Sequence, residues 1–334
     1  MKQHPKRIAA LAAALVLAAA PLFAQLELKV AAYVPANSPW DLGLKRLAAD
    51  FDRISGGKVR LVFPQSLKAA DESDIIRKMR IGVDGALLTT MGIAELHPDS
   101  LALALPSLFR NDAEFDAALA KVEPLIRAKL SDRYVMLTIA RGGWVRFFSK
   151  APMTYPEDLG RMRMSVSPND EKFQRLFQSI GTRTVKGTMP ELTLQLSSNA
   201  VDAFYLSPVL VASLWSQYRG KVLYMSPFRV APFIGAVVFT KQAWDKVPAE
   251  FRPRLEEATR EAARRMAADS AKLEEEAIAG LLKDGLSLSP SPADAEARWS
   301  AVYTERRNGL VASMFSEEFL KTLDDAIAPL RQKR

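Results

Sequence analysis

The sequence predicts a two-domain α/β protein whose strands end at a shared cleft. The stretch 188–215 predicts a short helix, a polar Val-Asp turn and a nearly all-apolar strand over 200–206. Such a strand is typical of parallel sheets that are covered on both faces. The stretch 75–92 repeats this design with a second Val-Asp turn. Because ligands bind at the C-terminal ends of strands in open α/β sheets, two such ends facing each other would form a cleft.

The length and composition of the chain are sufficient for this architecture. A chain of 334 residues with 49% hydrophobic content can bury a large core and is long enough for two domains. Charged residues make up an ordinary 25%, which argues against general disorder and a fibrous class. The formal net charge of +8 falls to +5 without residues 1–24, which carry three basic residues and no acidic one. No basic patch with interleaved aromatic residues is present, so we expect no nucleic-acid partner.

Residues 1–24 predict a secretory signal peptide that is cleaved near Ala24. A basic start precedes an apolar run over 8–20, which is shorter than the roughly 20 residues that a membrane span needs. The chain contains no cysteine, so neither a lipoprotein anchor nor a disulfide is expected. We therefore expect an exported, periplasmic protein.

The first half of the chain predicts alternating strands and helices. Ser38 is expected to cap the helix over 40–54, with Pro39 in its first turn. The run 101–109 predicts an extended apolar segment, and 111–130 predicts two helical pieces. The remaining predicted strands of this half cover 26–34, 58–63, 86–88 and 134–140, and a further extended run over 141–148 is expected to cross between the domains.

The second half predicts further strands and a long helix. The helix over 250–283 would be about 45–50 Å long at 1.5 Å per residue, which exceeds the diameter of one domain. It could therefore brace both domains. The other predicted strands cover 163–166, 221–225, 234–240 and 286–288, and the other predicted helices cover 168–180, 190–197, 293–310 and 316–331.

The chain offers few residues for catalysis. His97 is the one histidine after residue 24, and a single histidine in a loop is more often solvated than catalytic. No metal-binding spacing, P-loop or Ser-His-Asp set is present, so we expect neither an enzyme nor a bound metal or cofactor. Asp84 and Asp202 precede strands, and the better interpretation is that each accepts hydrogen bonds from nearby backbone N–H groups.

Arg146 stands out because aromatic residues flank it on both sides. Its planar guanidinium is a good receptor for a carboxylate and does not lose its charge. The alternative is an internal salt bridge, for example to Asp158 or Glu157. The sequence leaves these two interpretations open.

A series of short motifs follows the order known from one protein family. The motifs are Ser38-Pro39, Ser55-Gly56-Gly57-Lys58-Val59, Phe63-Pro64, Leu105-Pro106-Ser107-Leu108-Phe109, Pro156-Glu157-Asp158-Leu159, Asn199-Ala200-Val201-Asp202 and Ala243-Trp244-Asp245-Lys246-Val247-Pro248. With this order and spacing, nearly the whole chain after residue 24 resembles the DctP-type solute-binding proteins of TRAP transporters.

The resemblance implies a two-lobed periplasmic binding protein fold, with hinge strands and a long helix that spans both lobes. Lobe I would comprise residues 25–143 and 232–271, and lobe II residues 144–231 and 272–334. The lobes would close on a small ligand by a hinge. The implied partners are the small and large TRAP membrane subunits, and no catalysis is implied.

The chain departs from this family at its acid-binding positions. Ser165 stands where members that bind organic acids carry an arginine, and Leu206 stands where they carry an asparagine. Arg163 lies on the same strand face as Ser165, about 6.5–7 Å along the strand, and is an imperfect substitute. Arg161 is also near, whereas Arg146 matches a family arginine.

These departures favour a hydrophobic or amphipathic ligand with its head group at Arg146. A carboxylate would lack the charge-assisted bond that an arginine at position 165 supplies in acid-binding members. An apolar ligand instead gains about 25 cal/mol for each Å² that it buries. For each aromatic candidate, an ordinary core position remains the alternative. The candidate wall residues are Trp40, Met91, Phe204, Tyr205, Leu206, Phe228 and Phe233.

Other functions remain open at this stage. The protein could bind an organic acid through Arg146 with Arg163 or Arg161, or serve a sensor instead of a transporter. A secreted hydrolase on the same scaffold is a more remote alternative. Spirochaete relatives that lack the same arginine work with a periplasmic TPR protein, so such a partner is possible here.

Overall fold

The computed structural model describes residues 25–32, 34, 37–67, 72–168 and 170–332. The expected signal peptide lies outside these residues. The strands in the described part of the chain are β1 (Leu26–Ala32), β2 (Val59–Val62), β3 (Gly85–Thr89), β4 (Tyr134–Ser149), β5 (Arg163–Val166), β6 (Arg183–Lys186), β7 (Ala203–Leu206), β8 (Tyr224–Met225), β9 (Ala231–Thr240) and β10 (Ser287–Leu288).

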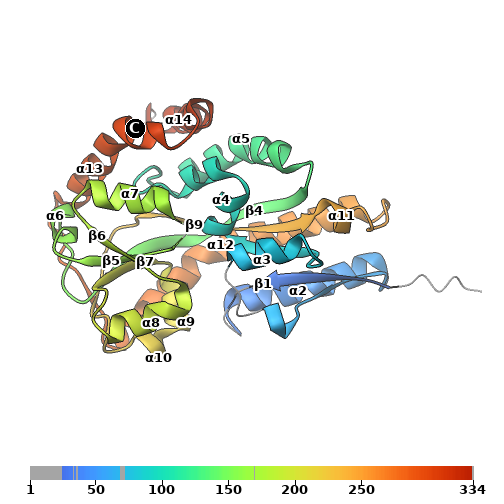
Figure 1. Ribbon diagram of the computed structural model, residues 1–334, viewed down its shortest axis with the longest axis horizontal. Coiled ribbons are helices and arrows are strands. Elements are labelled where there is room, and N and C mark those ends of the chain that lie inside the picture. The colour runs from blue at the N-terminus through green and yellow to red at the C-terminus, as the bar shows by residue number, and fades with distance from the viewer. Residues whose placement is uncertain (1–24, 33, 35–36, 68–71, 169, 333–334) are drawn as a thin grey trace, which may run out of the picture.

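Helices cover this sheet and the ends of the molecule (Figure 1). The α-helices are α2 (Pro39–Ser55), α3 (Glu72–Met79), α4 (Thr90–Leu96), α5 (Asp112–Leu130), α6 (Pro156–Leu159), α7 (Glu171–Ser179), α8 (Met189–Ser197), α9 (Pro208–Ser213), α10 (Trp215–Tyr218), α11 (Lys241–Trp244), α12 (Arg252–Lys283), α13 (Ala295–Gly309) and α14 (Glu317–Gln332). Three short 3₁₀ helices of the described chain are η2 (Gln65–Leu67), η3 (Pro98–Ala104) and η4 (Val311–Ser313).

Two long strands carry the sheet from one lobe to the other. The strand order is β2-β1-β3-β9-β4-β7-β5-β6, with β8 and β10 attached beside β4. The first part of β4 pairs with β9, and its last residues pair with β7 and β8. The two lobes therefore lie at opposite ends of one continuous sheet (Figure 1). One lobe is built on β1 and β3, and the other is built on β5 to β7. This confirms the predicted two-lobed α/β fold with crossing strands.

The crossing in β4 depends on two glycines. The register with β9 shifts between Arg141 and Trp144. Gly143 has a φ of 112°, which side-chain-bearing residues rarely adopt. A Cβ atom at Gly142 would approach both Trp40 and Phe233 to 3.2 Å. The chain thus bends between the lobes at a point where two aromatic side chains come close to its backbone.

The repeated helix–turn–strand units have the same local structure. Asp84 accepts a hydrogen bond from the backbone N–H of Lys29 at 2.8 Å, and its own N–H donates to the Lys29 carbonyl. Asp202 does the same with the backbone of Arg163. Each aspartate therefore fastens its strand to the adjacent parallel strand, as the sequence led us to expect. These two side chains belong to the scaffold.

Helix α12 spans both lobes, also as predicted. Its 32 residues correspond to about 48 Å. Leu255, near its start, packs into the core around β1 and β2, whereas Leu281, near its end, packs into the core around β7. A single rigid helix thus contacts the hydrophobic cores of both lobes.

Two predicted elements were wrong in detail. The segment 101–109 is not extended, because Leu101–Ala104 belong to η3 and are buried. A run that is apolar on every side shows no helical period, so the sequence could not distinguish the two conformations. Residues 111–130 form one helix, α5, and not two pieces, since Pro124 is accommodated inside it. Strand β6 and helices α4, α6, α9, α10 and α11 were not predicted, and the start of α4 was expected to be a loop.

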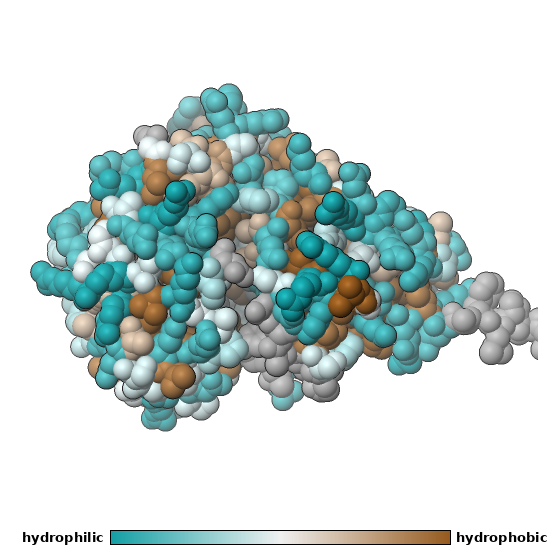
Figure 2. Space-filling view, viewed as in Figure 1, coloured by the Kyte–Doolittle hydropathy of each residue, from teal (hydrophilic) through white to brown (hydrophobic). Residues whose placement is uncertain are grey.

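The face of the molecule that Figure 2 shows is mainly hydrophilic, with scattered apolar side chains. Ile81 and Leu194 are the most exposed large hydrophobic residues of the described chain, at 82% and 70%. No helix in the described ranges combines the length and the hydropathy needed to cross a bilayer.

Candidate functional site

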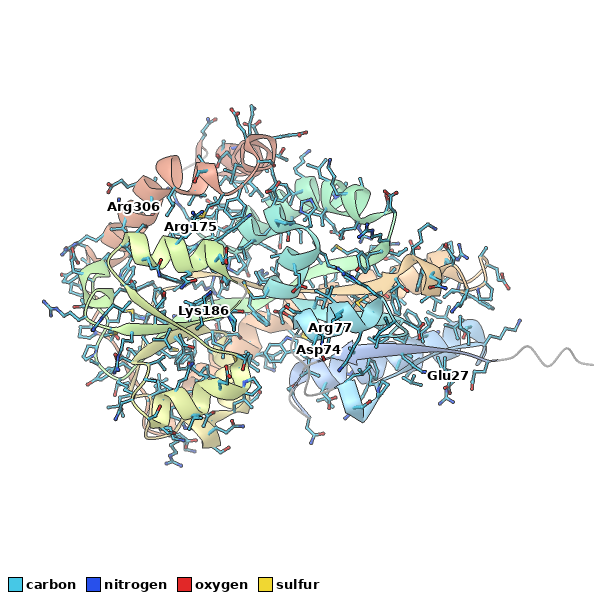
Figure 3. All side chains as sticks on the ribbon, viewed as in Figure 1. Glu27, Asp74, Arg77, Arg175, Lys186 and Arg306 are labelled. Carbon is cyan, nitrogen blue, oxygen red and sulfur yellow. The ribbon has the colours of Figure 1, made fainter. Side chains whose placement is uncertain are left out.

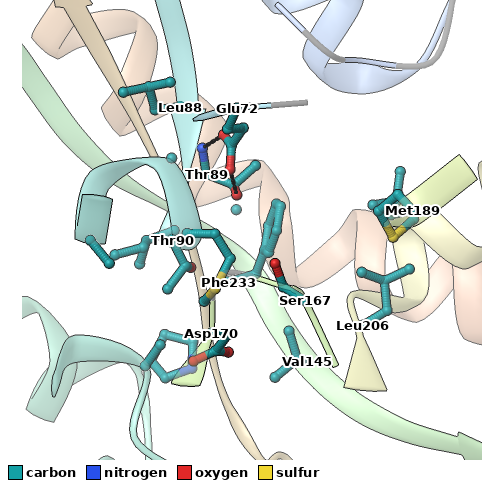
Figure 4. Close-up of a pocket in the computed structure, with 18 of the residues that line it drawn as sticks. Glu72, Leu88, Thr89, Thr90, Val145, Ser167, Asp170, Met189, Leu206 and Phe233 are labelled. Carbon is teal, nitrogen blue, oxygen red and sulfur yellow. Dashed lines mark hydrogen bonds between the residues drawn. The ribbon is translucent and has the colours of Figure 1, made fainter. Parts of the chain in front are cut away.

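A cavity of about 1160 Å³ lies between the lobes and receives side chains from both. Lobe I contributes residues of α2, β3 and α4, and lobe II contributes residues of β5, α7 and β7. Helix α12 adds part of the wall (Figure 4). The C-terminal ends of β3 and β7 both reach this space, where the twin-unit pattern predicted a cleft.

Most of the predicted ligand contacts do line this cavity. Trp40 packs edge-on against Phe233 with ring centroids 6.0 Å apart. Phe204 is only 2% exposed and stacks on Phe148, so it is also part of the hydrophobic core of lobe II. The predicted residues in the wall are Trp40, Met91, Ser165, Phe204, Tyr205, Leu206 and Phe233.

Phe228 does not line the cavity. Its ring is partly buried and packs against the main hydrophobic core, with its centroid 5.2 Å from that of Trp299 and 6.4 Å from that of Phe147. The alternative interpretation as an ordinary core residue is correct for this side chain. The loop over 227–232 gave no periodicity from which its direction could be inferred.

Arg163 lies outside the cavity wall and is engaged by Asp202. Its Nε and Nη2 each lie 2.8 Å from a different carboxylate oxygen of Asp202. This two-point pair holds the pKa of the Asp202 carboxyl below its usual range. Arg161 is exposed and also absent from the wall. Neither arginine replaces the acid receptor that is missing at Ser165.

Arg146 also lies outside the cavity wall and is buried against helix α12. Its Nη2 lies 3.0 Å from Glu274 Oε1, and the two side chains are 11% and 4% exposed. The same guanidinium donates to the carbonyl of Pro227. An internal ion pair is therefore the correct interpretation, although the partner is Glu274 and not Asp158 or Glu157. Because Arg146 does not line the cavity, it is not positioned for the predicted contact with a ligand head group.

We expect Glu274→Ala to lower the free energy of unfolding by about 3–5 kcal/mol. The substitution leaves the buried Arg146 cation unpaired and removes the acceptor of the Trp144 N–H, which lies 3.2 Å from Glu274 Oε2. Urea unfolding followed by tryptophan fluorescence measures the loss. The double variant Arg146→Met/Glu274→Leu should recover most of it, because no charge remains buried. A loss below about 1 kcal/mol in Glu274→Ala would contradict this role.

The sequence analysis missed Glu72, whose carboxylate lies in the cavity wall. The Glu72 Oε2 atom accepts the Thr89 hydroxyl at 2.7 Å and the Gly92 N–H at 2.9 Å, and the Thr89 N–H donates to Oε1 (Figure 4). Burial raises the pKa of Glu72, and these hydrogen bonds oppose that rise. An acidic residue in the first turn of a helix is common, so its sequence position carried no signal.

The two cations of the described wall are engaged by the protein itself. Arg141 is 5% exposed and bonds Ser270 Oγ at 3.1 Å and Asp112 at 3.0 Å. Lys172 donates to the Pro98 carbonyl at 3.1 Å, and its ammonium lies 4.1 Å from the centre of the Phe315 ring. Arg141 Nε is buried and has no hydrogen-bond partner within the described structure. A ligand anion therefore finds little uncommitted positive charge.

Asp170 is the most buried acid of the cavity wall, with 2% exposure. It caps α7 by accepting the Phe173 N–H at 3.0 Å, and it accepts the Tyr205 hydroxyl at 3.0 Å. Burial raises the pKa of Asp170 from 3.8 to about 6, against the opposing effect of these two hydrogen bonds and of Lys172. Tyr205, a predicted wall residue, is thereby tied to the first turn of α7.

The raised pKa predicts that the contribution of Asp170 to stability falls as the pH rises from about 4 to about 6. Over this range the folded protein retains a proton that the unfolded chain releases, and ionisation in the fold is disfavoured by about 3 kcal/mol. In Asp170→Asn this contribution is absent, so the unfolding free energy of wild type relative to the variant should decline across the range and level off above it. Chemical unfolding of both proteins between pH 4 and 7 tests this; a difference that does not change with pH would contradict it.

Comparison with known proteins identifies the family. The family model described as bacterial extracellular solute-binding protein, family 7 (DctP), matches residues 30–308. The chain belongs to this family.

Solved structures share the fold of this DctP-family protein at low sequence identity. A TRAP periplasmic solute-binding protein from Ralstonia eutropha with bound 2-acetolactate has 19% identity and a TM-score of 0.82, covering 91% of this chain and 99% of that one. One from Desulfovibrio salexigens with bound orotic acid has 16% identity, a TM-score of 0.82 and the same coverage. One from Sulfurospirillum deleyianum with bound succinate has 17% identity and a TM-score of 0.79, covering 89% and 98%. The inter-lobe cavity is thus the candidate solute site of a binding protein.

Proposed function

We propose that this DctP-family protein is the periplasmic receptor of a TRAP-type transporter and captures an apolar or amphipathic solute between its lobes. The single observation that carries this proposal is the wall of the cavity, which is largely apolar and whose two described cations already have protein partners. The signal peptide would be cleaved near Ala24 on export. The loaded receptor would deliver its solute to the two membrane subunits. The role is binding without catalysis, and a periplasmic TPR partner is compatible with it.

Closure would occur where β4 crosses between the lobes. The proposed boundary between residues 143 and 144 falls within the shift of register between Arg141 and Trp144. Gly143 supplies the unusual backbone conformation at that point. We propose lobes of 25–143 with 232–271 and of 144–231 with 272–334, with α12 bridging them.

The apolar contacts come from both sides of the cavity. Met91 and Phe233 stand on the lobe I side, whereas Leu206 stands at the end of β7 in lobe II. Burying a ligand against such side chains gains about 25 cal/mol for each Å². A ligand carboxylate would instead face the acids Glu72 and Asp170, and its desolvation would be uncompensated. This contrast favours an apolar solute.

A second candidate is an organic acid, because the three structural relatives described above hold acids. The arginines first considered for this role, Arg146, Arg161 and Arg163, do not line the cavity. An acid would therefore depend on Arg141, whose Nε has no partner in the described structure. Coupling to a sensor instead of a transporter would leave the ligand site unchanged.

Native mass spectrometry and organic-solvent extraction of the purified protein test the proposal. We expect an apolar or amphipathic compound to be retained and released by denaturation. Recovery of a short dicarboxylate, or tight binding of succinate to ligand-free protein, would support the second candidate and contradict the first.

The substitution Leu206→Asn tests the contribution of the apolar wall. We expect about tenfold weaker binding of the neutral probe phenylnaphthylamine, since the variant removes buried apolar area from the cavity. Leu223→Asn is a matched control, because Leu223 is 45% exposed and does not line the cavity. Equal affinities in the two variants would contradict the assigned role of Leu206.

A further inference from the structure

Two consecutive hydrogen bonds fix the hydroxyl group of Ser165 in the cavity wall. Ser165 stands on β5, is 8% exposed and lines the cavity. Its Oγ lies 3.1 Å from Oε1 of Gln195 on α8. Gln195 Nε2 in turn lies 2.9 Å from the carbonyl oxygen of Lys186, the last residue of β6. Figure 3 shows Lys186 on the side of lobe II that faces lobe I.

The Lys186 carbonyl determines which way the Gln195 amide faces. A carbonyl oxygen only accepts hydrogen bonds, so the NH₂ group of the amide faces Lys186 and its oxygen faces Ser165. Because an amide oxygen carries no hydrogen, the Ser165 hydroxyl is the donor in its bond with Gln195. The one proton of Ser165 Oγ is therefore committed to the protein.

The glycine that follows β6 leaves room for this arrangement. A Cβ atom at position 187 would overlap the amide group of Gln195, so a side chain there would displace that amide. Gly187 also donates its N–H to the Val166 carbonyl at 2.9 Å, which holds this backbone beside β5. The Gln195 amide is thus fixed by close packing against Gly187 as well as by its hydrogen bonds.

A ligand therefore meets the accepting side of the Ser165 hydroxyl. A serine oxygen has two lone pairs in addition to its proton. Within the described residues, no protein donor bonds to Ser165 Oγ. A ligand hydroxyl, amide or ammonium group can donate to this oxygen. A ligand ether, ketone or carboxylate oxygen finds no proton there, because that proton is bonded to Gln195.

Other hydroxyl groups of the described wall are committed in the same way. The Thr89 hydroxyl donates to Glu72 at 2.7 Å, and the Tyr205 hydroxyl donates to Asp170 at 3.0 Å. Both acceptors are carboxyl groups of the protein. These parts of the wall offer acceptors to a ligand and withhold donors. The Thr90 hydroxyl shows no such commitment within the described structure and can serve either kind of head group.

We propose that Ser165 is a specificity-determining residue that accepts a hydrogen bond from the solute, and that Gln195 is the positioning residue that commits its proton. The cavity then selects an amphipathic compound whose head group donates hydrogen bonds, as an alcohol, an amide or an amine does. This inference rests on the proposed capture of an apolar or amphipathic solute and names the chemistry of its head group.

Two isomeric probes separate hydrogen-bond donation from apolar contact. Octan-1-ol and 1-methoxyheptane have the same formula and nearly the same shape, but only the alcohol has a hydroxyl proton to donate. Their dissociation constants are measured at neutral pH by displacement of phenylnaphthylamine. We expect wild type to bind the alcohol about fivefold more tightly than the ether, which corresponds to one net hydrogen bond.

The variants Ser165→Ala and Gln195→Met should each abolish this preference, for different reasons. In Ser165→Ala the acceptor is lost, so the alcohol should bind about fivefold more weakly while the ether is unchanged. In Gln195→Met the Ser165 proton is released, so the ether should bind about fivefold more tightly while the alcohol is unchanged. Ser197→Ala is the control, because Ser197 bonds the Thr193 carbonyl of the same helix, is exposed and does not line the cavity.

Each result decides the question. Parallel losses for both probes would reveal a merely structural role and overturn the proposal, as would a wild-type preference below about twofold or one that survives in Ser165→Ala. If one variant does not fold, the other decides, and if neither folds, the wild-type preference decides.

Failure of the proposed function gives a different result. Wild type would then bind succinate and not phenylnaphthylamine. If wild type binds phenylnaphthylamine but prefers octanoate to octan-1-ol, the proposed amphipathic solute stands and the selection of a donating head group is overturned.

Discussion

The antiparallel pairing of β4 with β9 is the constraint on which the rest of the structure depends. These two strands join the parallel strands of lobe I to those of lobe II in one sheet. Because both lobes are attached to the same pair, the C-terminal ends of β3 and β7 are brought to one cavity. The register shift at Gly142 and Gly143 then sets how the lobes face each other.

The same arrangement determines what remains for a ligand. Crossing strands and a bridging helix place charged residues in the interior, where each needs a partner. Arg146 is held by Glu274 of α12 in the interior. Arg163, which is partly exposed, is held by Asp202. Glu72 and Asp170 are satisfied by backbone and hydroxyl donors. Most polar groups near the cavity are thus bonded within the protein, which is the basis for the proposed apolar solute.

The sequence predicted the elements whose periodicity is unambiguous. Strand β5 and the long helix α12 were located nearly to the residue, and the two Val-Asp turns indicated the paired strand ends. Ser165 and Leu206, which line the cavity, were picked out by the resemblance to the DctP family and not by periodicity. By contrast, the buried run 101–109 has no period that distinguishes helix from strand, and its conformation was mispredicted.

Charged contacts were less predictable, because their partners are remote in sequence. Glu274 is 128 residues from Arg146, and nothing local distinguishes it from the other acids of α12. Glu72 and Thr89 are 17 residues apart and meet only when α3 packs beside β3. Sequence could therefore identify Arg146 as unusual without showing whether a ligand or the protein itself would neutralise it.

The structure of the protein purified with its natural solute tests the central claim most directly. The account predicts an apolar portion of the solute against Met91, Leu206 and Phe233, with Glu72 still bonded to Thr89 and Gly92. A solute carboxylate in the place of the Glu72 carboxylate, or paired with Arg141, would contradict it.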